Sequence, residues 1–169
     1  MRDIVGEQAR PRRERESPAQ EATLVRQEIA YTLRSDRTVA VPNFGDSEIV
    51  GVDFFSGGVA VKFKLTNAHG DEFAVAVSIV GMQHFSLKTT FWQNVIESVK
   101  IFDCQADALL HGNELTRHTV QAFVDRQERM TRSFVPPTRY MVLEVNSVVD
   151  MDFVCVGSKI SMTSGDLVR

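Results

Sequence analysis

The fold is decided by residues 49–80, IVGVDFFSGGVAVKFKLTNAHGDEFAVAVSIV. Three apolar-rich runs are separated by Ser56-Gly57-Gly58 and by residues 67–71, which are the residue types that form turns. In the second run, apolar residues at 59, 61, 63 and 65 alternate with other residues, which is the period of a strand with one wet face. The two glycines supply the positive φ that a tight hairpin needs. These residues therefore predict a three-stranded antiparallel meander.

The overall composition predicts a soluble globular domain. The chain has 169 residues, of which 43% are hydrophobic and 24% charged, as is ordinary for globular proteins. Its net charge of −3 gives no general attraction to nucleic acids or acidic membranes. No apolar run reaches the roughly 20 residues of a membrane span, and residues 1–6 lack the apolar core of a signal peptide. We therefore expect a protein that is cytoplasmic or part of an assembled particle, with no membrane partner and no secretion.

The first 20 residues predict a flexible charged arm, and residues 21–169 predict a single α+β domain. The arm includes RPRRERE at residues 10–16 and has almost no apolar residue after Val5, so it cannot bury enough surface to offset the entropy of ordering it. Ser17 and Pro18 are typical of a helix start. Apolar residues then recur on one helical face at Ala22, Val25, Ile29 and Leu33. We expect this N-terminal helix to end near residues 34–36.

Beyond these elements, the sequence predicts a short strand before the meander and two helices and two strands after it. Residues 38–41 form the short strand, and Ser86 caps a helix that ends near Phe102, because apolar residues recur there at close to helical spacing. A second helix is expected over residues 114–131, followed by strands over 140–149 and 153–162. The expected fold class is thus α+β, with an antiparallel meander covered by two helices, an N-terminal helix and two C-terminal strands.

The polar residues do not predict an enzyme. No two of the four histidines have the i,i+4 spacing of a metalloprotease, and Cys104 and Cys155 lack the close spacing of a zinc or redox motif. Glycine-rich phosphate loops and activated-serine motifs are also absent from the sequence. We therefore expect no catalytic residues, no metal and no cofactor, and we expect both thiols to be reduced.

One stretch of the meander invites comparison with a known family. Residues 52–59, VDFFSGGV, loosely resemble the D-x-S-x-x-G element of PilZ domains, which bind cyclic di-GMP on a small β-barrel. The resemblance implies a small-ligand site on the meander. However, Phe55 occupies the serine position. The family also has an upstream R-x-x-x-R set, and neither Arg12/Arg13 nor Arg34/Arg37 has that spacing. The chain is therefore not assigned to PilZ domains, and a ligand sensor is a third hypothesis.

Arginine is unevenly distributed along the chain. Fourteen of the 19 basic residues are arginines, and none of these lies between Thr38 and Thr116. The planar guanidinium suits phosphate and carboxylate partners. Acids interleave with these arginines, however, a pattern typical of an exposed, salt-bridged helix. The residues we expect to contact a partner or a nucleic acid are Arg12, Arg13, Arg15, Arg117, Arg126, Arg129 and Arg132.

Two main hypotheses for function remain beside the ligand sensor. The first is a non-enzymatic structural or assembly protein that forms homo-oligomers and contacts other protein subunits in a larger complex such as a virion. A short sheet with long unsupported edges favours this hypothesis, because such a sheet can continue across a dimer. The alternative is a sequence-nonspecific RNA- or DNA-binding accessory protein that uses the arginine-bearing helix and arm. Phosphate binding weakens steeply with salt, whereas an apolar interface does not.

Overall fold

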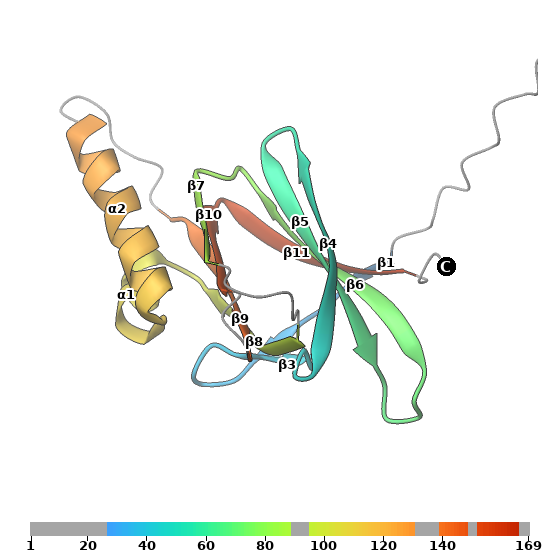
Figure 1. The fold of residues 1–169 in the computed structure, drawn as a ribbon. Coiled ribbons are helices and arrows are strands. Elements are labelled where there is room, and N and C mark those ends of the chain that lie inside the picture. The colour runs from blue at the N-terminus through green and yellow to red at the C-terminus, as the bar shows by residue number, and fades with distance from the viewer. Residues whose placement is uncertain (1–26, 89–94, 131–138, 149–151, 166–169) are drawn as a thin grey trace, which may run out of the picture.

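The computed structural model describes residues 27–88, 95–130, 139–148 and 152–165 (Figure 1). Within these ranges the chain is mostly antiparallel sheet with two helices, which fits the predicted α+β class. The predicted arm, residues 1–20, lies outside them. The elements are β1 (Gln27–Ile29), β2 (Thr32–Leu33), β3 (Val39–Val41), β4 (Ser47–Phe55), β5 (Gly58–Thr66), β6 (Glu72–Val80), β7 (His84–Lys88), β8 (Val95–Phe102), α1 (Gln105–His111), α2 (Glu114–Met130), β9 (Met141–Ser147), β10 (Asp152–Gly157) and β11 (Lys159–Gly165).

The predicted meander is confirmed. Strands β4, β5 and β6 pair antiparallel, and the alternating apolar residues of β5 are buried. Gly57 has φ of +78° in the first hairpin and Gly70 has φ of +85° in the second, as the turns require. Gly58 serves a different purpose, because a Cβ there would lie 2.5 Å from the carbonyl oxygen of Ile79. The predicted short strand before the meander is also present, as β3, and pairs with β2.

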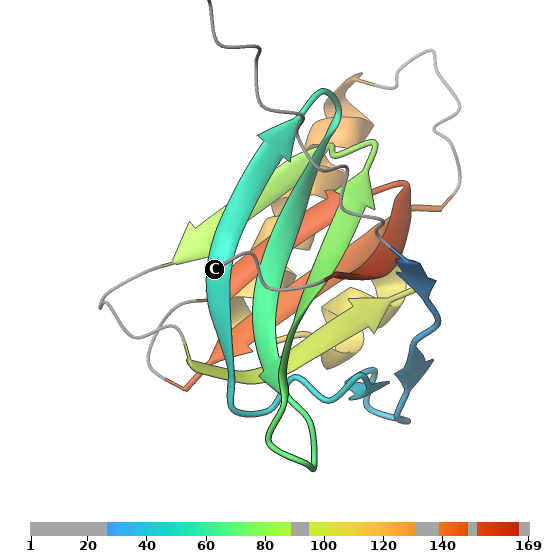
Figure 2. The ribbon, with the colours of Figure 1, turned by 90° about the vertical axis from the view of Figure 1, so that its right-hand side faces the viewer.

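The sheet bends into two halves that enclose the main core. Its strand order is β1-β11-β6-β5-β4-β8-β9-β10-β7, and β4 joins β8 only through the pairs Ser47↔Ile96 and Glu48↔Val95. The inner faces of both halves supply one hydrophobic cluster, which includes Val61, Val77 and Leu143. The helices lie outside the β8-β9-β10-β7 half, so the molecule has three layers (Figures 1 and 2). A second cluster fills the space beneath the helices and contains Phe102, Ala108, Val120, Phe123, Tyr140, Val142, Val154 and Val156.

The predicted helix from Ser86 to about Phe102 is wrong. Its beginning lies in β7 and its end is β8, while Phe91 and Trp92 lie outside the described residues. The apparent helical spacing arises because β8 has a register shift between Ile96 and Ser98, which displaces its alternation by one residue. The β-branched residues of this segment also favour a strand. The two described helices, α1 and α2, cover the outer face of the β8-β9-β10-β7 half. The prediction that two helices cover the meander is therefore also wrong.

The predicted N-terminal helix is also contradicted over the residues that are described. Residues 27–29 form β1 and residues 32–33 form β2, with residues 30–31 connecting them, and residues 17–26 lie outside the described ranges. Ile29 and Leu33 fit both a helical i,i+4 spacing and a strand alternation, but Tyr31 between them decides for the strand. All three side chains are partly buried against the main core, while Ala30 and Thr32 are exposed.

The C-terminal region contains three strands instead of the predicted two. The first prediction corresponds to β9, but the second is divided by a turn at Ser158 into β10 and β11. These two strands belong to opposite halves of the bent sheet, because β10 pairs with β9 and β11 pairs with β6. The turn is held by Ser158, whose backbone N–H and hydroxyl both donate to the carbonyl oxygen of Val80 at 2.9 Å. The helix predicted over 114–131 is confirmed as α2.

Candidate functional site

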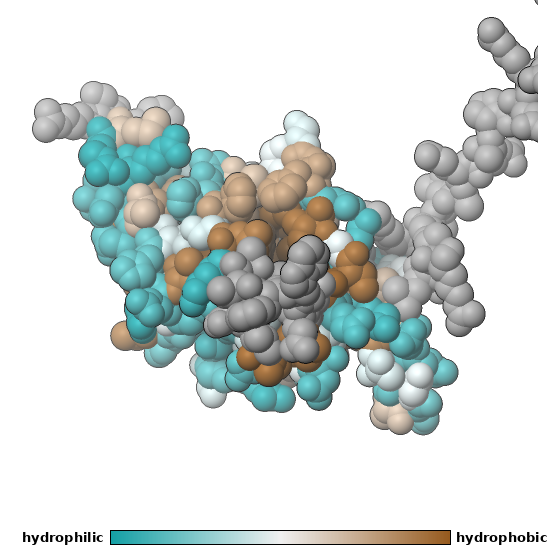
Figure 3. Space-filling view, in the orientation of Figure 1, coloured by the Kyte–Doolittle hydropathy of each residue, from teal (hydrophilic) through white to brown (hydrophobic). Residues whose placement is uncertain are grey.

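An apolar groove lies between β4 and β7, where the interior of the bent sheet opens to solvent. Its volume is about 310 Å³. Figure 3 shows hydrophobic side chains gathered on the face that carries these strands. The lining residues are Ile49, Val50, Gly51, Val52, Phe54, Val61, Phe85, Leu87 and Phe153. Because Ile49, Val61 and Phe153 also belong to the main core, the groove is a continuation of that core to the surface.

The β4 wall is uncovered because β8 leaves it early. After Glu48, β4 has a register shift between Ile49 and Gly51 and then pairs with β5 alone among the described strands. The pairs Val52↔Val61 and Phe54↔Val59 place Val52 and Phe54 on the inner face, since cross-strand partners share a face. The side chains of Val52 and Phe54 are therefore directed inward at a position where no described strand covers them.

The β7 wall faces the same interior. Its register with β10 pairs Leu87 with Phe153 and Phe85 with Cys155, and both β10 residues belong to the main core. The rings of Phe54 and Phe85 meet across the groove with their centroids 5.5 Å apart. Even so, Phe54 remains 59% exposed and Leu87 54% exposed. Large apolar side chains that stay this exposed together, beside a core, are typical of surfaces that contact proteins, membranes or small ligands.

The two ends of the nine-stranded sheet differ in how well their edges are protected. At one end, β1 has only three residues and carries Glu28. Short length and charge are the usual means by which an edge strand avoids pairing with another chain. At the other end, β7 has five residues, contains no proline, and carries its one fixed charge on its last residue, Lys88. Within the described residues β7 pairs only with β10, so apart from Lys88 its second edge lacks such protection.

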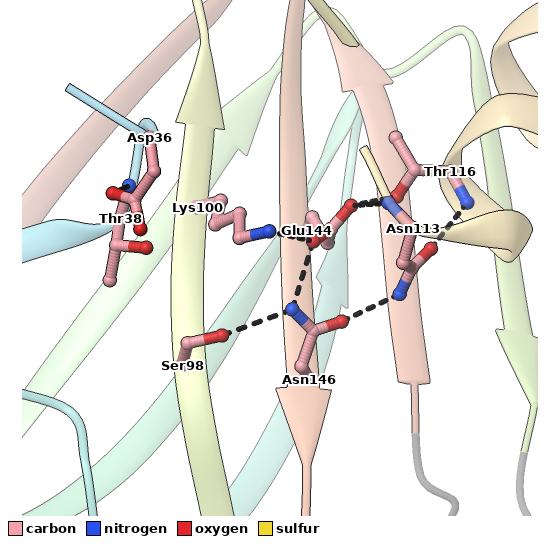
Figure 4. A network of polar contacts seen from close by, with 8 residues as sticks. All are labelled: Asp36, Thr38, Ser98, Lys100, Asn113, Thr116, Glu144 and Asn146. Carbon is pink, nitrogen blue, oxygen red and sulfur yellow. Dashed lines mark hydrogen bonds and ion pairs between the residues drawn. The ribbon is translucent and has the colours of Figure 1, made fainter. Parts of the chain in front are cut away.

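A polar cluster on the opposite face of the same half centres on Glu144 of β9 (Figure 4). The side chain of Glu144 is fully buried. Its Oε1 accepts a hydrogen bond from Nδ2 of Asn146 at 2.8 Å and lies 3.4 Å from Nζ of Lys100. Its Oε2 accepts from the backbone N–H of Asn113 at 2.8 Å and from the hydroxyl of Thr116. Both carboxylate oxygens are therefore fully engaged, as a buried charge requires.

The same cluster fixes the start of α2 on the sheet. Oδ1 of Asn113 accepts from the backbone N–H of Thr116 at 2.7 Å, which is the hydrogen bond of a helix N-cap. Nδ2 of Asn113 donates to Oδ1 of Asn146 at 2.6 Å, and Asn146 in turn donates to Oγ of Ser98 at 3.0 Å. The cluster thereby connects α2 to β8 and β9. Its hydrogen bonding is that of a structural anchor, since Glu144 has no lone pair left for a reaction.

A polar cleft of about 620 Å³ adjoins this anchor. Its walls carry charges of both signs, including Arg34, Lys100 and Asp36. The pKa of Asp36 is lowered, chiefly by the hydrogen bond that its carboxylate accepts from the backbone N–H of Thr38, at 3.1 Å. With positive and negative side chains interleaved, the cleft presents no dominant charge that would select an anion or a cation.

The arginines predicted as contact residues are not brought together as one surface. Arg117, Arg126 and Arg129 are all exposed on α2. At 3.6 residues per turn, Arg126 and Arg129 lie about 60° apart around the helix, whereas Arg117 and Arg126 lie about 180° apart. The structure therefore groups Arg126 with Arg129 and separates Arg117 from Arg126. The remaining predicted contact residues, Arg12, Arg13, Arg15 and Arg132, lie outside the described ranges.

The histidines and cysteines form only local contacts in the described part of the chain. His111 lies 3.8 Å from Asp107, and His118 lies 3.7 Å from Glu114, each as an i,i+4 pair. No group of three metal-ligating side chains occurs among the residues that the structure describes. Cys104 and Cys155 are free thiols. Burial raises the pKa of Cys155 to about 12, so this thiol is inert at neutral pH.

Comparison of the chain with protein-family models, curated proteins and solved structures finds no match. No helix within the described ranges is long and apolar enough to cross a membrane. Sequence reasoning did not identify the groove residues Phe54, Phe85 and Leu87 or the anchor residue Glu144. The adjacent Phe54 and Phe55 interrupt the strand alternation, and this was the one sequence signal that pointed to the groove.

Proposed function

We propose that this protein is a non-enzymatic assembly subunit whose copies bind one another through the groove between β4 and β7. The observation that carries this proposal is the exposure of apolar side chains beside an unprotected sheet edge. Burial of apolar surface is the main driving force for protein association, and an open edge strand is a template for pairing with another chain. The five exposed groove side chains are Val50, Val52, Phe54, Phe85 and Leu87.

The size of the groove supports a contact between two copies. These five side chains are 41–59% exposed. Since a fully buried aromatic side chain covers roughly 150–250 Å², together they present on the order of 400 Å² of apolar surface. A standard interface buries about 800 Å² on each partner. The groove therefore supplies about half of such an interface, and neighbouring backbone and polar groups supply the polar rim that surrounds an apolar centre.

The proposed assembly extends to other subunits of a larger particle. The arginines Arg12, Arg13 and Arg15 are the proposed contacts for those subunits, because a highly charged segment with few apolar residues suits a contact with charged partner surfaces. The alternative, binding of RNA or DNA, rests on the pair Arg126 and Arg129. It is disfavoured because Asp125 and Glu128 are interleaved with these arginines on α2.

Static light scattering of the full chain tests the proposal, with and without a mixed RNA pool, at low and at physiological salt. We expect an oligomer whose mass is insensitive to both salt and RNA. The variant Leu87→Lys places a charge in the groove and should give a monomer. Leu110→Lys is the matched control, because Leu110 is also an exposed leucine, 71% accessible, but lies on α1 away from the groove.

Two results would overturn the proposal. The first is a parent protein that is monomeric under every condition. The second is a parent protein that gains mass only with RNA and only at low salt, since this would favour the arginine surface and the nucleic-acid alternative.

A further inference from the structure

We infer that two copies join through antiparallel pairing of β7 with β7 of the second copy, so that one sheet continues across a two-fold axis. This inference rests on the proposed function and specifies the mode of binding at the same groove. A two-fold contact uses the same surface on both partners, which a single edge strand paired with itself provides. Of the two ends of the described sheet, the β7 end has the longer edge strand, five residues against three, and carries the exposed apolar side chains Phe85 and Leu87.

The sequence of β7, HFSLK, defines the register. Pairing centred on Ser86 places Phe85 opposite Leu87 of the partner copy and His84 opposite Lys88 of the partner copy. This register uses all five residues of β7. It also keeps Phe85 and Leu87 on the inner face in both copies, where they lie next to the core residues Phe153 and Cys155. A slip of one residue would set apolar inner positions against polar outer ones, which is why the centred register is favoured.

The pairing also covers the groove. Phe85 and Leu87 form the β7 wall, so a second β7 beside the first continues that wall past the exposed Val52 and Phe54 of β4. Two aromatic–aliphatic cross-strand pairs form, one on each side of the axis, and such pairs are the favourable contacts of antiparallel sheets. The apolar surface and the open edge are thus removed from water by one contact.

The outer face of β7 has room for this contact. Between α2 and the end of β7 there is a hollow of about 380 Å³, lined by Lys88, Leu115, His118 and Asp152 among others. The helix α2 contacts β7, and the hollow leaves space beside Lys88 at the end of the strand. His84 and Lys88 lie on this outer, polar face, where the hollow leaves space for the polar pair of the second copy.

Site-specific disulfide formation tests the register, in full-length protein that carries Cys104→Ser to remove the half-exposed native thiol. In Ser86→Cys the two introduced residues face each other across the axis. Facing Cα atoms in antiparallel pairs are about 4.5–5.5 Å apart, within the range of a disulfide. We expect mild oxidation to convert most of this variant into a covalent dimer.

His84→Cys is the matched control, because the two copies of residue 84 are offset by four positions, roughly 13 Å, in this register. It should remain uncrosslinked, whereas His84→Cys combined with Lys88→Cys should crosslink as efficiently as Ser86→Cys. A dimer by light scattering in which His84→Cys alone crosslinks and Ser86→Cys does not would overturn the inference and leave the proposed function standing. A protein that stays monomeric by light scattering would overturn both.

Discussion

The two faces of the β8-β9-β10-β7 half of the sheet differ in which kind of side chain they bury. On the outer face, the charged side chain of Glu144 is fully buried, and every carboxylate oxygen has partners from α2, β8 or β9. On the inner face, at the groove, the apolar side chain of Leu87 on β7 remains more than half exposed, as does that of Phe54 on β4 across the groove. A charge is thus enclosed while hydrophobic groups are left in water, the reverse of the usual distribution.

The difference separates the contacts that stabilise the monomer from the apolar side chains that the proposed assembly would bury. Burial of Glu144 is tolerable because the fold supplies all of its partners, so this region is complete within one chain. Within the described chain, the apolar side chains of the groove remain partly in contact with water. Covering them with another surface would lower the free energy of the system. Substitutions in the two regions should therefore change different quantities, namely the free energy of unfolding and the free energy of association.

The largest effect is expected for Glu144→Ala. Loss of the Glu144 carboxylate leaves the Lys100 ammonium and the Asn113 N–H without their buried partner. Breaking a buried charge pair typically costs about 3–5 kcal/mol of stability. The measurement is the free energy of unfolding in urea. Glu48→Ala is the control, because Glu48 pairs with Lys64 at the surface and should cost less than about 1 kcal/mol. Equal effects of the two substitutions would contradict the assignment of Glu144 as an anchor.

A smaller effect, on association alone, is expected for Phe54→Asp. A charge at this groove position should raise the dissociation constant of the oligomer by at least about 10-fold, equivalent to about 1.4 kcal/mol, and should leave the unfolding free energy of the monomer nearly unchanged. Sedimentation equilibrium measures the first quantity and urea unfolding the second. Val41→Asp is a matched control, since Val41 is 58% exposed on β3 and does not line the groove. An unchanged dissociation constant for Phe54→Asp would exclude the groove from the interface.

The ionisation of the Cys155 thiol tests whether water reaches β10, the strand behind the groove. It lies opposite Phe85 in the register of β10 with β7, and burial raises its pKa from 9.0 to about 12. The unfolded chain therefore loses this proton first, and the unfolding free energy should fall by up to about 1.4 kcal/mol per pH unit between about pH 9 and 12. Urea unfolding at pH 8, 9 and 10 should show that the stability advantage of the parent over Cys155→Ala shrinks as pH rises. An advantage that is independent of pH would show that the thiol is not held in its neutral form.

The smallest effect is expected for Arg126→Glu combined with Arg129→Glu. Both arginines are exposed on α2, and exposed substitutions usually change stability by less than about 0.5 kcal/mol each. The mass by light scattering should also equal that of the parent, with or without RNA. If instead the parent binds RNA and the double variant does not, these arginines contact nucleic acid, and the groove is no longer the principal contact surface.

The sequence predicted those elements whose pattern has one physical explanation. The alternation in β5 and the glycine turns identified the meander, and the apolar residues that follow Gly112-Asn113, although less regular in spacing, identified α2. Ile29 and Leu33 failed as predictors because a four-residue spacing suits a helix and a strand equally well. In β8, the register shift between Ile96 and Ser98 converted a strand alternation into an apparent helical repeat.

The candidate sites were harder to predict because they depend on contacts between distant segments. Glu144 carries no local sign of burial, since its partners come from two other parts of the chain: Lys100 from β8, and Asn113 and Thr116 from the start of α2. Leu87 lies in the segment that the sequence predicts as a helix from Ser86, and Phe85 precedes that segment, so the sequence does not show that the two share a face of one strand. Only the register of β7 with β10 and the bend of the sheet place them opposite Phe54.

Amide hydrogen exchange of the parent protein at low and high concentration tests the central claim most directly. If copies associate through the groove and the β7 edge, the amides of residues 84–88 should exchange more slowly at the concentration where the oligomer forms. The amides of residues 27–29, at the protected β1 end of the sheet, should exchange equally at both concentrations. Protection at β1 with none at β7, in a sample shown by light scattering to be oligomeric, would contradict the account and move the interface to the opposite end of the sheet.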